Sequence, residues 1–390
     1  MVDSKSRNYL IKGGRLYDPE ERGEKDVLIG GNEVLKVQEG IPPPEELEVE
    51  IIKAAGKAVI PGLVDLHVHI TGGGGESGPR SRVPEILLSE IVEAGVTTVA
   101  GVLGTDNVSR SPEELLMKVK ALNESITAVG YTGSYHLPSS TITGSVKKDV
   151  SLIEEFVGVK CAISDHRSSQ PTKRELARLA SRARVGGMLG NVPGVVHLHV
   201  GNGSRGLEPI FEVLEETEFP PAQLLPTHVG RNHDLLTQGV ELVKRGGFMD
   251  ITCPANPRNQ LGDLVSSVET LLESGIPLSH ASLSSDSNGS LPEFDESGNL
   301  VDISRGQIRS IFRTFSELVK QGVLSLPRAL ELVTKNPARR LGVFHSKGSL
   351  EKGKDADLVI LDENLEPEVV FAGGKPLLKN KEILIEDPFG

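Results

Sequence analysis

Residues 62–69 read GLVDLHVH, and the glycine-rich stretch 71–75 follows almost directly. The apolar run predicts a buried strand, in which residues two apart point to the same side. His67 and His69 should therefore project together from the end of this strand, as a pair of imidazoles suited to bind zinc. An isolated His-x-His motif more often holds one packed and one solvated histidine, but its position at the end of an apolar run favours the metal site.

Seven further apolar runs follow, and helical patterns separate them up to about residue 345. The eight candidate strands are Gly62–His69, Thr97–Leu103, Thr127–Gly130, Val157–Ile163, Gly194–Val200, Leu224–His228, Phe248–Thr252 and Ala281–Ser285. Helices are predicted over Pro84–Ala94 and over Glu113–Asn123, and a capping-box spacing precedes the second helix. Eight strands separated by helices predict an α/β chain with a (β/α)8 TIM-like barrel over residues 61–345.

Both ends of the chain are rich in short strand candidates. These are Tyr9–Ile11, Asp26–Ile29, Glu33–Val37 and Val49–Ile52 near the start, and Asp357–Leu361, Val369–Ala372 and Glu382–Ile385 near the end. Gly-Gly pairs and Pro-rich breaks separate them. We therefore expect a small, discontinuous β-sandwich domain built from residues 1–60 and 346–390.

The composition limits the classes of partner. A net charge of -12 at pH 7 argues against nucleic acid or an anionic membrane, and an anionic substrate would need local arginines. The two cysteines, Cys161 and Cys253, do not suggest a disulfide framework. The first residues contain charges, and no apolar stretch reaches the ~18 residues of a membrane span. These features predict a soluble, cytoplasmic protein without a signal peptide.

Lys160 lies inside the apolar run Val157–Ile163. A lysine within a buried strand is unfavourable unless it has a partner or loses its charge. One interpretation places Lys160 at a strand end, with its amine reaching water. The other is functional, because a neutral amine can react with carbon dioxide to form a carbamate, an anionic ligand able to bridge two metals.

Further candidate ligands follow later strands, namely His199, His228 and Asp286. A lone histidine is more often structural than a ligand, but candidates at successive strand ends of one barrel indicate a shared metal centre. His197 shares the strand face of His199, so the spacing alone does not choose between them. The glycines at 72–75 lack the Lys-Ser or Lys-Thr of a phosphate-binding loop, which favours a loop that moves or passes close to a ligand.

The candidate ligands resemble the metal-ligand order of the amidohydrolase superfamily, and the chain resembles the isoaspartyl dipeptidase family within it. The closer resemblance rests on GGGGESGP (72–79), GTD (104–106), TGSYH (132–136), ITGSV (142–146), VKCAISDHR (159–167) and NGS (288–290). It covers nearly the whole chain, including GKDAD at 353–357, and its match at residues 199–201 favours His199 over His197.

The resemblance implies a metallopeptidase with two Zn²⁺ ions per subunit. The implied ligands are His67, His69 and Asp286 for one ion, His199 and His228 for the other, and carbamylated Lys160 as the bridge. In that family the nucleophile is a hydroxide between the metals, whose proton Asp286 would take and pass to the leaving amine. Tyr135 would polarise the scissile carbonyl and stabilise its oxyanion.

The resemblance also implies the substrate, a β-aspartyl (isoaspartyl) dipeptide that would be hydrolysed to aspartate and an amino acid. Glu76 would bind the substrate's ammonium group, and Arg167 and Arg231 are natural partners for its carboxylates. The implied substrate-binding residues are Gly74, Glu76, Thr105, Tyr135, Arg167, Arg231 and Ser290. A homo-oligomer, such as an octamer, is also expected.

Two other functions fit parts of the pattern. A cyclic-amide hydrolase, such as a dihydroorotase or hydantoinase, shares the metal site, but its substrates have no ammonium group that would need Glu76. A non-catalytic scaffold would have lost metal ligands, whereas every ligand position is filled here. His345 is expected at the surface or in a linker, and structural or supporting roles are expected for His136, His166, His197, His233 and His280.

Overall fold

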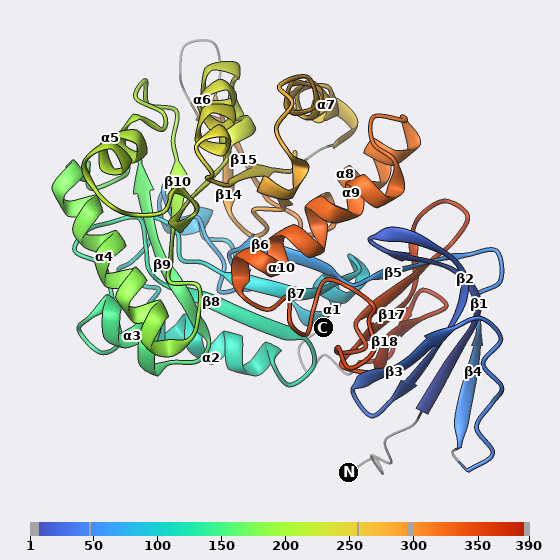
Figure 1. Cartoon of the computed structure of the whole chain (residues 1–390). Helices are drawn as coiled ribbons and strands as arrows, with labels where there is room; N and C mark the ends of the chain where they lie inside the picture. The colour runs from blue at the N-terminus through green and yellow to red at the C-terminus, as the bar shows by residue number, and fades with distance from the viewer. Residues whose placement is uncertain (1–7, 47, 256, 295–299, 386–390) are drawn as a thin grey trace.

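The computed structural model describes residues 8–46, 48–255, 257–294 and 300–385 (Figure 1). At its centre lie eight barrel strands: β6 (Leu63–Val68), β7 (Val96–Gly101), β8 (Thr127–Gly133), β9 (Phe156–Ile163), β10 (Val195–Val200), β11 (Leu224–Thr227), β12 (Met249–Thr252) and β13 (Ala281–Ser284). Six of them form a parallel sheet in the order β11-β10-β9-β8-β7-β6, and β12 pairs in parallel with β13. Each overlaps a predicted strand, and the predicted barrel fold is confirmed.

Hydrogen bonds join the two groups of barrel strands. The backbone N–H of His69, just after β6, donates to the carbonyl of Ser287, just after β13, at 2.9 Å. On the other side, the Thr227 hydroxyl of β11 donates to the Asp250 carboxylate of β12 at 2.7 Å. The carboxyl ends of the strands therefore meet at one rim, where barrel enzymes hold their functional groups.

Helices surround the barrel strands (Figure 1). They are α1 (Leu88–Glu93), α2 (Pro112–Leu122), α3 (Val146–Leu152), α4 (Lys173–Gly190), α5 (Glu208–Glu216), α6 (His233–Lys244), α7 (Pro257–Glu273), α8 (Arg309–Lys320), α9 (Leu326–Val333) and α10 (Lys335–Leu341). The prediction for α2 is confirmed, with the Ser111 hydroxyl accepting from the Glu114 N–H at its start.

The helix predicted over Pro84–Ala94 begins only at Leu88, so its first part was wrong. The backbone N–H of Val83 donates to the carbonyl of Gly73 at 2.9 Å, and that of Ile86 donates to the carbonyl of Ile70 at 3.2 Å. These bonds tie the segment before the helix to the glycine-rich loop, and a helical turn there would break them.

Strands from both ends of the chain form one nine-stranded sheet beside the barrel (Figure 1). The strands are β1 (Asn8–Asp18), β2 (Glu20–Gly30), β3 (Glu33–Gln38), β4 (Val49–Lys53), β5 (Ala58–Pro61), β16 (Leu358–Leu361), β17 (Pro367–Ala372), β18 (Lys375–Lys379) and β19 (Glu382–Ile383). Their order is β19-β18-β17-β16-β5-β1-β2-β3, with β4 paired to β1. The rings of Tyr9 in β1 and Phe371 in β17 meet with centroids 5.0 Å apart although β16 and β5 separate their strands, so the sheet curls around its own core. The β-rich domain is thus confirmed.

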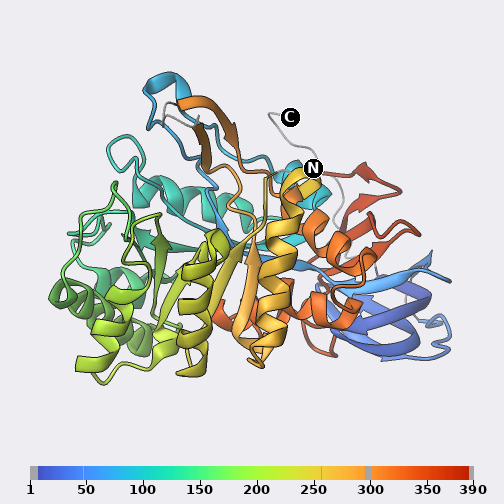
Figure 2. The same ribbon diagram turned by 90° about the horizontal axis from the view of Figure 1, so that it is seen from above.

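An antiparallel hairpin of β14 (Ser290–Phe294) and β15 (Leu300–Arg305) was not predicted. It projects from the rim beside the light blue glycine-rich loop (Figure 2), and the Ser290 hydroxyl donates to Glu76 of that loop at 2.9 Å. Single 3-10 turns occur at Pro79–Ser81, Pro221–Gln223, Val229–Arg231 and Leu278–His280. Across the described ranges, no helix combines the length and apolar character needed to cross a membrane.

Candidate active site

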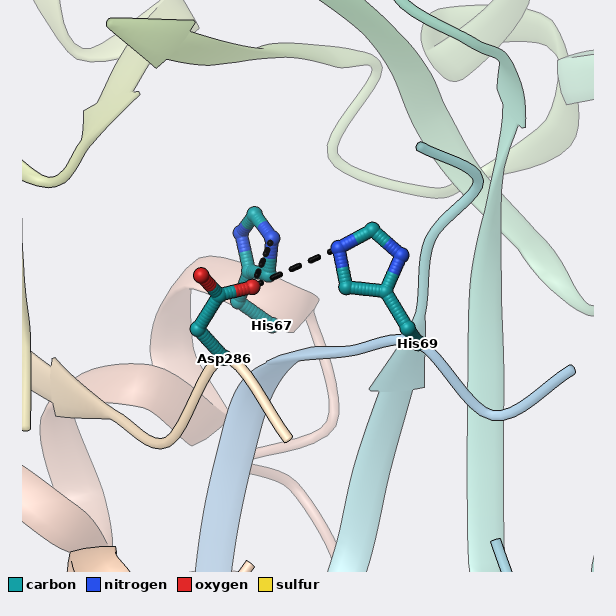
Figure 3. Close-up of side chains that lie close together, drawn as sticks. All are labelled: His67, His69 and Asp286. Carbon is teal, nitrogen blue, oxygen red and sulfur yellow. Dashed lines mark ion pairs between the residues drawn. The ribbon is translucent and has the colours of Figure 1, made fainter. Parts of the chain in front are cut away.

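Three predicted metal ligands meet at the barrel rim. His67 and His69 come from the end of β6, and Asp286 follows β13, so that their polar ends point toward one another (Figure 3). The Oδ1 atom of Asp286 lies 3.3 Å from the Nε2 atoms of both histidines. Burial alone would raise the pKa of Asp286, but its contacts with His67 and His69 hold that pKa well below its ordinary range. An anionic carboxylate between two imidazoles could hold a metal ion.

The protonation of these side chains and their lack of hydrogen-bond partners fit a metal site. Burial lowers the pKa of His67 to about 3, so its imidazole is neutral and has a free electron pair. Among the described residues, His228 Nε2 and Asp286 Oδ1 are buried and form no hydrogen bond. Buried polar atoms normally have a partner, so these two atoms fit a site that a cation completes.

Lys160 of β9 is fully buried beside these ligands. Its Nζ atom lies 3.4 Å from both ring nitrogens of His67. Burial lowers the pKa of Lys160 to about 7, so much of the amine is uncharged at neutral pH. The buried amine therefore does not reach water from a strand end.

His199 and His228 form the second predicted ligand pair. Their ring centroids lie 4.6 Å apart, and the ring of His228 lies 5.2 Å from that of His67. Burial lowers the pKa of His199 to about 3 and that of His228 well below its ordinary value, so both rings are neutral. His228 follows β11 with a left-handed backbone, φ 66°, and its Nδ1 lies 2.6 Å from the Thr252 hydroxyl.

His197 and His199 share one strand face but have different neighbours. The Nε2 atom of His197 lies 2.8 Å from Nδ1 of His67, and its ring stacks on Tyr131 at 4.8 Å. His199 instead faces His228, and its Nδ1 lies 2.7 Å from the hydroxyl of Tyr135. This arrangement favours His199 as the ligand and makes His197 a support for His67.

Several predicted substrate-binding residues gather at the mouth of the site. Arg167 Nη1 lies 3.4 Å from Glu76 Oε1, and Ser290 donates to the other oxygen of Glu76. The guanidinium of Arg167 also lies over the ring of Tyr135, 5.5 Å from its centroid. Burial raises the pKa of Tyr135 above its ordinary value, so its hydroxyl stays protonated and can donate a hydrogen bond.

The other predicted binding residues lie nearby. The exposed Arg231 has Nη1 3.4 Å from Asn202 Oδ1, and its positive charge opposes the rise that burial causes in the pKa of Tyr135. The Thr105 hydroxyl is buried and has no hydrogen-bond partner within the described ranges. Gly74 has φ +76°, and a Cβ there would lie 2.3 Å from the Ser81 carbonyl, so only glycine fits.

The remaining histidines divide into two groups. His166, His233 and His345 are exposed. His136 and His280 are partly buried, and His280 lies outside the site, where burial lowers its pKa.

The structure adds three residues to which the sequence analysis gave no role. Asp165 accepts a hydrogen bond from His199, as developed below. Arg110 is buried and donates to the carbonyls of Gly73 and Val83 at 3.2 and 2.8 Å, which fixes the glycine-rich loop. The Asp250 carboxylate lies in the barrel interior and accepts from three hydroxyls, those of Thr227, Ser282 and Ser284. These contacts link segments that are far apart in the chain, so the sequence of one segment does not reveal them.

Comparisons with known proteins show the family of the chain. A model of the amidohydrolase family matches residues 58–377. A crystal structure of the β-aspartyl dipeptidase from Fervidobacterium islandicum AW-1, in complex with β-Asp-Leu, is 40% identical and superposes with a TM-score of 0.90 over 97% of this chain and 98% of that one.

More distant relatives share the fold. The dihydroorotase of Ligilactobacillus salivarius is 25% identical over 92% of this chain and 90% of its own length. The dihydropyrimidinase of Brevibacillus agri, 16% identical with a TM-score of 0.68, is similar in fold alone. The predicted resemblance to isoaspartyl dipeptidases is confirmed. With the family match over most of its length, the chain belongs to the amidohydrolase family.

Proposed function

We propose that the chain is a zinc-dependent β-aspartyl dipeptidase. The observation that carries this proposal is the pairing of Glu76 with Arg167 at the mouth of the site, 3.4 Å apart. A β-aspartyl dipeptide carries an ammonium group and two carboxylates, so it needs both signs of charge near the scissile bond. The 40% identical protein that was solved with β-Asp-Leu supports the same substrate class.

The metal centre follows from the neutral imidazoles and the buried carboxylate. His67, His69 and Asp286 would hold one zinc ion, His199 and His228 would hold the second, and carbamylated Lys160 would be a ligand of both. To form the carbamate, the neutral amine of Lys160 would attack carbon dioxide: a nitrogen–carbon bond forms as one carbon–oxygen π bond opens, and the proton lost by nitrogen passes to water. When bound, two zinc ions supply Lewis acidity, which polarises the scissile carbonyl and makes a water molecule acidic near neutral pH.

Proton transfer is assigned to Asp286, whose carboxylate lies between His67 and His69. As the water oxygen bonds to the scissile carbonyl carbon, Asp286 takes a proton from that water. It then gives the proton to the leaving nitrogen as the carbon–nitrogen bond breaks. The products are aspartate and a free amino acid. Tyr135, protonated and next to His199, donates a hydrogen bond to the carbonyl oxygen as negative charge develops there.

Substrate orientation is assigned to charges at the rim. The Glu76 carboxylate would bind the ammonium group of the aspartyl half. Arg167 and Arg231 would bind the carboxylates, because a guanidinium fork matches a carboxylate with two hydrogen bonds. The backbone at Gly74 and the hydroxyls of Thr105 and Ser290 would complete the contacts.

Regiospecificity tests the proposal directly. Zinc-loaded protein should hydrolyse β-Asp-Leu at least about 100-fold faster than α-Asp-Leu, because the α-linked peptide moves its carboxylate away from its partners. Initial rates of leucine release from both peptides measure this ratio. Equal rates on the two peptides would contradict the proposal.

A second candidate is hydrolysis of a cyclic amide, which the similarity to dihydroorotases favours. Such a substrate has no free ammonium group, and so gives Glu76 no partner. If zinc-loaded protein cleaves neither dipeptide but opens dihydroorotate or a hydantoin, this second function is the correct one.

The Glu76→Gln variant tests the ammonium contact. We expect KM for β-Asp-Leu to rise by about tenfold or more, since a hydrogen bond to a charged group contributes roughly 1.5–3 kcal/mol. Steady-state kinetics at saturating zinc measure the change. Glu85→Gln is the matched control, because Glu85 belongs to the same rim segment but pairs with Lys118. An unchanged KM in Glu76→Gln would show that another group binds the ammonium.

A further inference from the structure

Asp165 lies at a turn that brings it close to β10. It is the second residue after β9, and its carboxylate is buried. Ser164 before it has a left-handed backbone, φ 51°, which redirects the chain at this point. After β10, Gly201 lets the two segments touch, because a Cβ on residue 201 would lie 2.4 Å from the Cβ of Asp165. The turn therefore places a carboxylate against the histidines of the neighbouring strand.

Both oxygens of Asp165 are engaged by functional candidates. Oδ2 lies 2.8 Å from Nε2 of His199, and the same oxygen accepts from Nη2 of Arg167 at 2.8 Å. Oδ1 accepts from Nε of Arg167 at 3.0 Å and from its backbone N–H at 2.8 Å, and the exposed His166 lies 3.6 Å away. A guanidinium that donates through both Nε and Nη2 pairs with an ionised carboxylate, so Asp165 is an anion.

These contacts determine which nitrogen of His199 carries the proton. An ionised carboxylate only accepts hydrogen bonds, so Nε2 of His199 must donate to Asp165. In a neutral ring the other nitrogen, Nδ1, then has an electron pair and no hydrogen. That nitrogen lies 2.7 Å from the Tyr135 hydroxyl oxygen, and a metal on Nδ1 would replace this contact and leave the hydroxyl hydrogen for the substrate carbonyl.

The same carboxylate also orients Arg167. Two guanidinium nitrogens, Nε and Nη2, are held by Asp165, and the third, Nη1, is directed to Glu76 at the mouth. We propose that Asp165 is a positioning residue that fixes the proton on Nε2 of His199, leaving Nδ1 for zinc, and aims Arg167 at the substrate. The part about substrate rests on the proposed dipeptidase activity, whereas the part about zinc rests only on the proposed metal centre.

The Asp165→Asn variant tests both parts. An asparagine can turn its amide N–H toward Nε2, which favours the wrong proton position on His199. We expect one of the two zinc ions to bind about 10- to 100-fold more weakly and the other to bind as in the wild type, as for other partners of ligating histidines. Titration with a chromogenic zinc chelator, with metal content by mass spectrometry, resolves the two affinities. We also expect KM for β-Asp-Leu to rise severalfold.

A matched control separates this role from general stabilisation. Asp149 is also buried and accepts from the hydroxyls of Thr132 and Thr143, both at 2.6 Å, but the structure places it against no candidate ligand. Asp149→Asn should lower the melting temperature and leave both zinc affinities unchanged. If Asp165→Asn does not fold, Gly201→Ala answers the question, because its methyl group must displace Asp165 and should weaken the same zinc ion.

The outcomes are distinct. The proposal is overturned if folded Asp165→Asn binds both zinc ions as tightly as the wild type does. If only Gly201→Ala folds, the same result in that variant overturns it. An equal loss of zinc affinity in Asp149→Asn would also overturn the proposal, because the loss would then not depend on the contact with His199. Selective loss of one zinc ion in a protein that proves inactive on β-Asp-Leu would support the positioning role and refute the proposed function alone.

Discussion

The Asp286→Asn variant is expected to retain its zinc but to hydrolyse β-Asp-Leu about 100- to 10,000-fold more slowly than the wild type. Asparagine keeps an oxygen where Oδ1 now lies 3.3 Å from His67 and His69, so it can still face a metal. It cannot accept a proton from water or deliver one to the leaving nitrogen. Turnover number and zinc per subunit should be measured on the same sample.

The Asp149→Asn variant is the control for this prediction, since it makes the same substitution at another buried carboxylate. Within the described residues, Asp149 accepts from the hydroxyls of Thr132 and Thr143 and from the backbone N–H groups of Ile142 and Thr143. Its turnover should stay within a few-fold of the wild type. A fully zinc-loaded Asp286→Asn protein with near-normal turnover would refute the proton-transfer role.

The Lys160→Ala variant should lose most of its zinc, and its activity with it. Removing a residue that only hydrogen-bonds to a metal ligand weakens metal binding about 10- to 100-fold. Lys160 would itself be a ligand of both ions, so its removal should weaken zinc binding by more than this. A short-chain carboxylate such as propionate should restore part of both zinc content and activity, because it fits the space left by the side chain and supplies the missing anion. Metal analysis before and after incubation with zinc and propionate measures the effect.

Lys347→Ala serves as the control, because Lys347 is also buried but pairs with Asp357 at 2.8 Å and Asp355 at 3.0 Å, near the β-rich domain. This variant should lower the free energy of unfolding without changing zinc content. Undiminished zinc in Lys160→Ala would rule out Lys160 as the bridge.

The barrel was predictable because each of its strands is an apolar run that ends near a glycine or a polar residue. Of the strands that were missed, β14, β15 and β18 lack this pattern, whereas β5 has it over only four residues. β18 contains two lysines and Pro376, which is tolerated because a bulge in β17 lies opposite it, between Val370 and Phe371. β14 likewise contains Pro292 and a glutamate, so only its pairing with β15 reveals it.

For the site, the sequence identified side chains that share a strand face but not the contacts between strands. His67 and His69 follow from alternation within β6 alone. The contact between Asp165 and His199 instead depends on the register of β9 against β10, in which Ala162 lies opposite His199, and on the turn at Ser164. The different neighbours of His197 and His199 likewise required the packing of other strands against β10.

The shared sheet of the two chain ends has a consequence for synthesis on the ribosome. β5 pairs with β1 on one side and with β16 on the other, and these partners are separated by the whole barrel. While the barrel emerges, β5 therefore has one open edge, and such edges invite pairing with other chains. Only when residues 358–361 leave the exit tunnel can β16 cover it. A nascent chain stalled before that point should consequently associate with other chains more readily than the full-length protein.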